Sequence, residues 1–145
     1  MQDRRADFQI FLKIYFDKDF NVDEITAATG LQPCLCERYS MSGYTKVSDI
    51  KQDGAWWYSF PSPTSFLKAT SVQEVLDEFF QPFDKEKTER LRKIVRENGG
   101  EVRLTVNIWF FRGFVPELCF DGQPMRILNS LDAGIDINMN EEAGE

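Results

Sequence analysis

The chain has no histidine, few cysteines and no long apolar run, and each shortage excludes a class of protein. Histidine has the side-chain pKa closest to neutrality, so it dominates general acid–base catalysis and metal ligation. A membrane-spanning helix needs about 20 continuous apolar residues, and here Lys, Gln, Arg or Asn interrupts every apolar stretch. The sequence therefore favours a binding protein over an enzyme, with no cofactor and no membrane contact.

The cysteines and the amino terminus predict a cytoplasmic protein. No apolar segment typical of a secretory signal follows Met1, and an odd cysteine count forms no disulfide scaffold. Cys34 and Cys36 form a C-x-C pair, with Cys119 far along the chain. Three thiolates without an imidazole are too few for a structural zinc site, and no neighbouring base activates a thiol. We expect reduced, partly buried cysteines and no metal.

Basic residues are also scarce. The chain carries 17 Lys and Arg against 24 Asp and Glu, a net charge of −7. Nonspecific nucleic-acid binding needs a basic surface, so we expect no nucleic acid as a partner. The same charge suits attraction to a basic protein, although it also serves simply to keep a small protein soluble.

What the chain does contain is a pattern of strands and helices. Its 145 residues suit one domain, which we assign to residues 1–140, with residues 141–145 as a frayed acidic tail. Strict alternation of apolar and polar residues predicts long strands over 8–16 and 101–111. Shorter strands are expected over 56–60, 118–120 and 135–139. Residues 34–55 read as a long irregular loop.

Four helices are expected between these strands. The first follows a cap at Asn21 and ends at Gly30, and Ser71 with Glu74 forms a capping box before the second. Asp84 caps a third helix that runs to residue 98, and a fourth covers 124–131. This order predicts an α+β two-layer sandwich, related to ferredoxin-like folds, with a mostly antiparallel sheet of about four to five strands and helices on one face.

Several segments are similar to one family. They are Asn21-Val22-Asp23-Glu24-Ile25-Thr26 with Gly30-Leu31-Gln32-Pro33, the strand around Trp57, and residues 131–137, which read Leu-Asp-Ala-Gly-Ile-Asp-Ile. Together they resemble the bacterial domain of unknown function 4279 over about residues 8–139. Where members often carry Ser or Thr after the proline, this chain has Cys34. The resemblance implies a small bacterial α+β protein and supplies no catalytic residues.

Other candidate sites have simpler explanations. Asp132, Asp136 and Asn138 lie close in sequence, and two neighbouring carboxylates could perform acid–base chemistry or hold a cation. Polar residues belong on the solvated side of the last strand, however, so we interpret Asp136 and Asn138 as a solvated face and Asp132 as part of the turn after the helix. No G-x-G-x-x-G or P-loop pattern follows a strand. Aromatic residues on a sheet are also typical of RNA-binding platforms, yet the acidic charge and the missing basic-aromatic motif argue against RNA.

The feature that remains is the second face of the sheet, away from the helices. Alternation places eight candidate partner-binding residues there: Phe11, Lys13, Tyr15, Trp57, Arg103, Asn107, Trp109 and Asp136. Trp, Tyr and Arg are enriched at the energetic centres of protein interfaces. The sequence leaves three uses of this face open: docking of a partner protein, structural covering by loop 34–55 or by the second subunit of a homodimer, and a small-molecule cleft.

Two functional hypotheses follow. The first is an immunity-type inhibitor, a cytosolic protein that occludes a basic toxin or effector with its aromatic face; it rests on small size, acidity and missing catalytic groups, and on analogy. The second is a sensor that holds a small metabolite between the sheet face and loop 34–55. An enzyme using Asp, Cys, Tyr or Lys is the least favoured interpretation.

Overall fold

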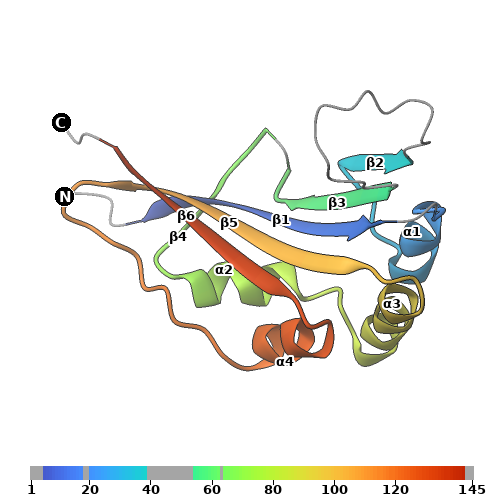
Figure 1. The fold of residues 1–145 in the computed structure, drawn as a ribbon. Helices are drawn as coiled ribbons and strands as arrows, with labels where there is room; N and C mark the ends of the chain where they lie inside the picture. The colour runs from blue at the N-terminus through green and yellow to red at the C-terminus, as the bar shows by residue number, and fades with distance from the viewer. Residues whose placement is uncertain (1–4, 18–19, 39–53, 63, 143–145) are drawn as a thin grey trace.

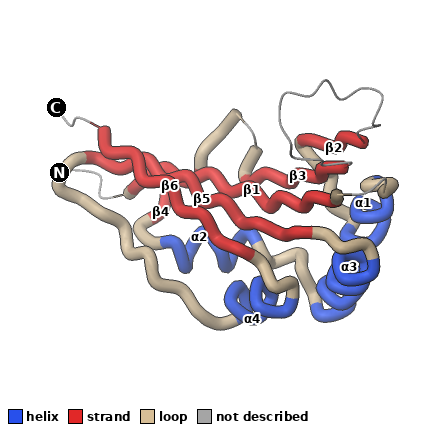
Figure 2. The backbone as a smooth tube through the Cα atoms, in the orientation of Figure 1, coloured by secondary structure: helices blue, strands red, loops and turns tan. Residues whose placement is uncertain are grey.

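The described part of the chain forms one open sheet with four helices packed on one of its two faces (Figures 1 and 2). This computed structural model describes residues 5–17, 20–38, 54–62 and 64–142. The elements are β1 (Ala6–Phe16), α1 (Asp23–Thr29), β2 (Leu35–Arg38), β3 (Gly54–Phe60), β4 (Leu67–Ala69), α2 (Val72–Phe79), α3 (Lys85–Glu97), β5 (Glu101–Phe111), α4 (Gln123–Ser130) and β6 (Gly134–Glu142). The predicted two-layer α+β sandwich is confirmed.

The two long alternating strands, β1 and β5, lie side by side at the centre of the sheet. The strand order is β2-β3-β1-β5-β6, and β4 pairs with the first residues of β1. All pairs are antiparallel except β5 and β6, which run parallel. The register pairs Lys13 with Trp57 on one side and with Arg103 on the other, so residues of equal parity in β1, β3 and β5 share a face.

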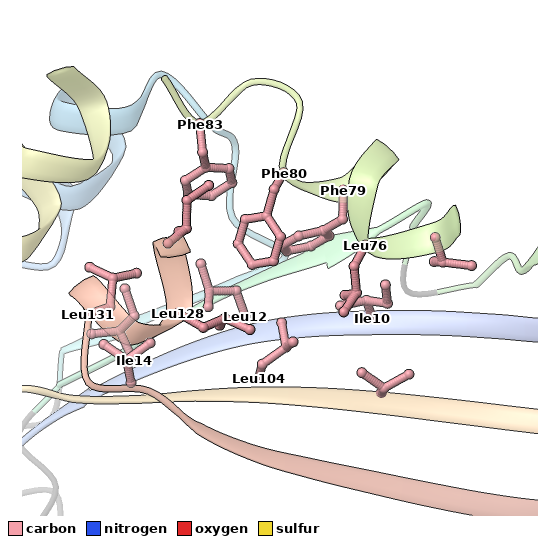
Figure 3. Packing of buried hydrophobic residues seen from close by; sticks show 14 of the residues in the cluster. Ile10, Leu12, Ile14, Leu76, Phe79, Phe80, Phe83, Leu104, Leu128 and Leu131 are labelled. Carbon is pink, nitrogen blue, oxygen red and sulfur yellow. The ribbon is translucent and has the colours of Figure 1, made fainter. Parts of the chain in front are cut away.

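The core lies between the sheet and the helices. Phe8, Ile10, Leu12, Ile14 and Phe16 of β1 are at most 1% exposed, as alternation predicted. Figure 3 shows Leu76, Phe79, Phe80, Phe83, Leu128 and Leu131 from the helical layer pointing toward this strand. Each fully buried aliphatic or aromatic side chain contributes about 1.5–3 kcal/mol, so this layer contact dominates the stability of the domain.

Local signals fix the helix ends. The Ser71 hydroxyl accepts from the Glu74 N–H (3.2 Å), and Asp84 accepts from the Lys87 N–H (2.7 Å), as predicted. Gly30 ends α1 with φ +73°, a left-handed conformation that glycine adopts without strain. The predicted cap at Asn21 is displaced, because α1 begins after Val22 and Asn21 instead accepts from the Asp23 N–H (3.1 Å).

The strand predictions need three corrections. Residues 118–120 form no strand; only Glu117 makes an isolated bridge, with Ser71, while Leu118 and Phe120 pack against the core. Two short strands were missed: β2 lies within the expected loop 34–55, and β4 follows the prolines after β3. The last strand extends to Glu142, through the first two residues of the expected tail.

The apolar side of β6 is also less buried than its pattern suggests. Ile135, Ile137 and Met139 lie beside Leu104, Val106 and Ile108 on the helix side of the sheet, yet each is 37% exposed. The reason is position: β6 is an edge strand, so one flank of this row has no neighbouring strand within the described chain.

Candidate docking face

All eight predicted residues lie on the sheet face opposite the helices. The register aligns Phe11, Lys13 and Tyr15 with positions of β3 and β5 that have the same orientation, and it brings Asp136 of β6 opposite Thr105 on the same face. Each of the eight is partly buried, neither sealed nor fully exposed. Trp56, the neighbour of Trp57, points the other way and is 0% exposed in the core.

An aromatic cluster with a lysine at its centre occupies one end of this face. The Phe11 and Tyr15 rings meet the Trp57 ring edge-on, with centroids 6.0 and 6.3 Å away. The Lys13 Nζ atom lies 4.3 Å from the Trp57 ring centroid and 5.7 Å from that of Phe11, within cation–π range. We call Phe11, Lys13, Tyr15 and Trp57 the Trp57 cluster.

Burial within the cluster changes two pKa values. Desolvation lowers the pKa of Lys13, with Arg103 acting in the same direction and Asp136 and Cys34 opposing it. Desolvation also raises the pKa of the Tyr15 hydroxyl. The same burial reduces the hydration of the Lys13 ammonium group.

The indole N–H of Trp57 has no hydrogen-bond acceptor among the described residues, although the atom is buried. The Tyr15 hydroxyl is near enough for the indole to lower its pKa slightly, but the two groups do not reach hydrogen-bond geometry. A buried donor without an acceptor costs about 1–3 kcal/mol. The cluster thus contains a buried donor without a described acceptor beside a poorly hydrated Lys13.

A bidentate ion pair lies next to the cluster. Arg103 donates from Nε to Asp136 Oδ2 (2.8 Å) and from its terminal nitrogen to Oδ1 (2.7 Å). The hydrogen bonds from Arg103 lower the pKa of the Asp136 carboxyl, and the pair raises the pKa of the guanidinium. The sequence suggested that Asp136 is a solvated carboxylate. In the structure Arg103 holds it in place through two hydrogen bonds.

Asn138 is likewise engaged, since its amide donates to Asn107 Oδ1 (2.8 Å). Asp132, the third member of the predicted polar group, lies in the turn before β6 with φ +52°. The described residues contain no group of three or more His, Cys, Asp or Glu arranged to hold a metal ion.

A second, smaller aromatic group lies at the far end of the face. Trp109 contacts Phe66, which is 50% exposed, edge-on at 4.9 Å between ring centroids. Trp109 pairs with Asp7, six residues along β1 from Lys13, so the two groups are separated by roughly 20 Å at about 3.4 Å per residue. Phe66 was missed because it follows β3 in a proline-containing stretch where alternation gives no orientation.

The charges on this face nearly balance one another. By register, the charged groups described there are the carboxylates Asp7, Glu101, Asp136 and Glu142 and the cations Lys13, Lys68 and Arg103. Asp7 and Lys68 pair at 2.9 Å, and Arg103 pairs with Asp136, so Lys13 is the described cation without an ion-pair partner. The described part of this face therefore carries little of the chain's net charge of −7.

The excess of acidic groups lies elsewhere. Five carboxylates occur on α2 and on the segment after β5: Glu74, Asp77, Glu78, Glu117 and Asp121. Gln73 ties these segments together through hydrogen bonds with Asp121 (2.7 and 3.1 Å). No Lys or Arg occurs in residues 69–84 or 113–125, so this helix-side surface is distinctly acidic.

The cysteines are more exposed than predicted. Cys34 and Cys119 are both exposed free thiols, which corrects the expectation of partial burial. The Cys34 N–H donates to the Trp57 carbonyl (2.7 Å), which holds the segment before β2 beside the Trp57 cluster. Of the predicted loop 34–55, residues 39–53 lie outside the described residues, so its role as a cover or a ligand wall stays a prediction.

A groove of about 780 Å³ lies at the end of the sheet where α3 and α4 finish. Its lining includes Arg92, Arg96 and Arg103, with Asn129 and Ser130. Arg103 thus borders both this groove and the helix-free face. Sequence patterns did not predict the groove, because its lining combines two segments that are distant in sequence, residues 92–103 and 129–134.

No helix among the described residues is long and apolar enough to cross a membrane. No curated protein and no solved structure matches this chain. The model of one family, described as a domain of unknown function (DUF4279), does match residues 6–142. That span includes every strand and helix of the sandwich, and the chain belongs to the DUF4279 family.

Proposed function

We propose that this chain is a non-enzymatic cytoplasmic protein that binds a partner protein through its helix-free sheet face. One observation carries the proposal: the Trp57 cluster combines partly exposed aromatic rings, a poorly hydrated Lys13 and a buried indole N–H without an acceptor among the described residues. Aromatic residues in a partly desolvated setting are typical of the energetic centre of an interface. A partner's carboxylate oxygen placed over the rings would accept from the Lys13 ammonium group.

The size of the face supports the same proposal. A specific interface buries about 800 Å² on each side, and the Trp57 cluster and the Trp109–Phe66 pair span roughly 20 Å at about 3.4 Å per residue along β1. Between them lie small and neutral polar residues, Gln9, Ser59 and Thr105, all buried. Such a face offers two aromatic groups separated by buried polar residues.

The specific form we propose is an immunity-type inhibitor of a basic toxin or effector. Here the nearly neutral sheet face would make the contact, whereas the acidic surface over α2 would accelerate encounter with a basic partner from a distance. Since steering is screened by salt while aromatic contacts are not, salt should slow association far more than it speeds dissociation.

Affinity capture from the native cell tests the proposal. The tagged wild-type chain should recover a partner that Trp57→Ala recovers roughly tenfold less well or worse, the loss expected for an interface centre. Met125→Ala is the matched control, because Met125 is 44% exposed on α4 in the helical layer. The recovered partner is then produced alone, and its dissociation constant for each variant is measured by calorimetry.

Circular dichroism must first show that Trp57→Ala is folded. Equal affinity of a folded Trp57→Ala and of Trp109→Ala for the partner, both unchanged from the wild type, would contradict docking through this face. If the partner is a toxin, co-expression of the wild-type chain should protect cells while Trp57→Ala should not.

A small-molecule sensor is the alternative function. It is supported by the groove at the ends of α3 and α4, whereas the predicted ligand site lay between the sheet face and loop 34–55. The groove with Arg92 and Arg96 has the size of a small-molecule site, and neighbouring arginines suit a carboxylate or phosphate. A thermal-shift screen with inorganic phosphate and simple carboxylates tests this candidate: stabilisation lost in Arg96→Gln would favour it over protein docking.

A further inference from the structure

The two edges of the sheet differ in how well they are protected. An edge strand presents unpaired N–H and C=O groups, and proteins usually block such edges with short strands, lysines, prolines or bulges. At one edge β2 has four residues, whereas β6 at the other has nine. β6 contains no Lys, Arg or Pro, and its register with β5 runs unbroken from Gly134 to Glu142.

β6 carries three carboxylates: Glu141 and Glu142 lie at its end, where Glu141 is 3.5 Å from Arg112, and only Asp136 lies in the middle of the strand. Asp136 is held by Arg103 of β5 through two hydrogen bonds of 2.7 and 2.8 Å, so it is already committed to the sheet. Asn138 is bonded to Asn107, and the Asn140 amide donates to the Ile108 carbonyl. The polar side chains of β6 thus turn back toward β5, and no described segment pairs with its outer side.

The helix side of β6 carries a matching apolar row. Ile135, Ile137 and Met139 are each 37% exposed, and they follow one another at the two-residue spacing of a strand face. A row of large apolar side chains beside an unpaired backbone edge is what an added strand would cover, because side-chain contact and backbone hydrogen bonds would form together.

We infer that the occupant is a second copy of this chain, with the two β6 strands antiparallel about a two-fold axis at Ile137. In that register Ile137 faces Ile137 of the second copy, and Ile135 faces Met139 in both directions. On the other face Asp136 meets Asn138, so no carboxylate opposes another over residues 134–140. The strand is therefore self-complementary, as an isologous interface requires, and the two sheets become one.

This dimer is independent of the proposed docking face. The pairing uses the edge of β6, and the Trp57 cluster stays open on each copy. Each chain carries a net charge of −7, and salt screens the repulsion between two such chains without weakening apolar contact. Dimer affinity should therefore rise with ionic strength, the opposite of an interface held by ion pairs.

A cysteine cross-linking experiment tests the register in a background with Cys34, Cys36 and Cys119 changed to Ser. Ile137→Cys should be joined to its copy by a short bifunctional thiol cross-linker, because directly opposed Cβ atoms lie about 4.5–5.5 Å apart, just beyond the roughly 3.5–4.5 Å that a disulfide spans. Ile135→Cys is the matched control: it lies on the same strand face with the same exposure, but its copy is four residues away, roughly 13 Å. Adding Met139→Cys to Ile135→Cys should restore cross-linking.

Sedimentation equilibrium of the unmodified chain gives the second readout. We expect a reversible dimer, weakened roughly tenfold or more in Ile137→Lys, where two cations would be opposed within an apolar row. Met139→Lys should weaken the dimer in the same way, and it replaces Ile137→Lys as the test if that variant does not fold. A strictly monomeric wild-type chain at all soluble concentrations, or equal cross-linking of the Ile135→Cys and Ile137→Cys variants, would overturn the inference.

Discussion

Trp56 and Trp57 are adjacent in sequence and have opposite environments. Trp56 is 0% exposed beneath the helices, and its indole N–H donates to the Thr26 hydroxyl at 3.0 Å. Trp57 is partly exposed on the other face, and its buried N–H has no acceptor among the described residues. On β3, the indole N–H therefore has a hydrogen-bond acceptor on the helix side of the sheet and no described acceptor on the other side.

This difference separates stability from recognition. A buried polar group is normally paired, because leaving it unpaired is expensive. The helix side obeys this rule at Trp56, where α1 supplies the acceptor. The helix-free side departs from it at Trp57, and such departures are expected where a partner completes the contact. The comparison predicts that changes at Trp56 act on folding, whereas changes at Trp57 act mainly on binding.

The largest effect should come from Trp56→Ala. Removing a fully buried tryptophan costs about 3–5 kcal/mol, a large part of the stability of a domain this size. Trp57→Ala removes a partly exposed ring and an unsatisfied N–H, and should cost clearly less. Urea denaturation followed by circular dichroism measures both. Equal losses for the two variants would mean that the helix-free face is part of the folding core.

A smaller effect is expected at Thr26, which isolates the hydrogen bond. Thr26→Val keeps the shape of the side chain but removes the acceptor, so the Trp56 N–H becomes buried and unpaired, like that of Trp57. The expected loss is about 1–3 kcal/mol in the free energy of unfolding. In a Trp56→Phe background the same substitution should cost much less. A full loss in that background would show that Thr26 acts through packing alone.

Much of this comparison was readable from the sequence. The two-residue period of a strand assigned Trp57 and the other seven candidate residues to one face, and the structure places all eight there. Alternation succeeds here because a side-chain period of two is imposed by strand geometry itself. The same holds for the caps at Ser71 and Asp84, which are local hydrogen bonds within four residues.

What the sequence did not predict depends on distant partners. The Arg103–Asp136 pair joins residues 33 positions apart, and nothing in either strand specifies that β5 and β6 are parallel neighbours. The exposure of the apolar residues of β6 was not predicted for the same reason, since alternation shows which side of the sheet a residue faces but not whether its strand lies at the edge. The short β2 and β4 lack enough residues to show a period.

The smallest effect on stability should come from the Arg103–Asp136 ion pair on the helix-free face, and it should depend on pH. Because Arg103 lowers the pKa of Asp136 below 3.8, the pair stabilises the fold above the unfolded pKa, and the contribution is lost as pH falls through the folded pKa. The difference in unfolding free energy between the wild type and Asp136→Asn should therefore be constant near neutrality and narrow below about pH 4. The pair is partly exposed, so the effect is modest.

Urea denaturation of the wild type and of Asp136→Asn at a series of acid pH values measures this difference. Glu141→Gln, which removes a single 3.5 Å contact to Arg112, is the matched control. If the difference in unfolding free energy stays constant through this acid range, the Arg103–Asp136 ion pair does not contribute to the stability of the fold.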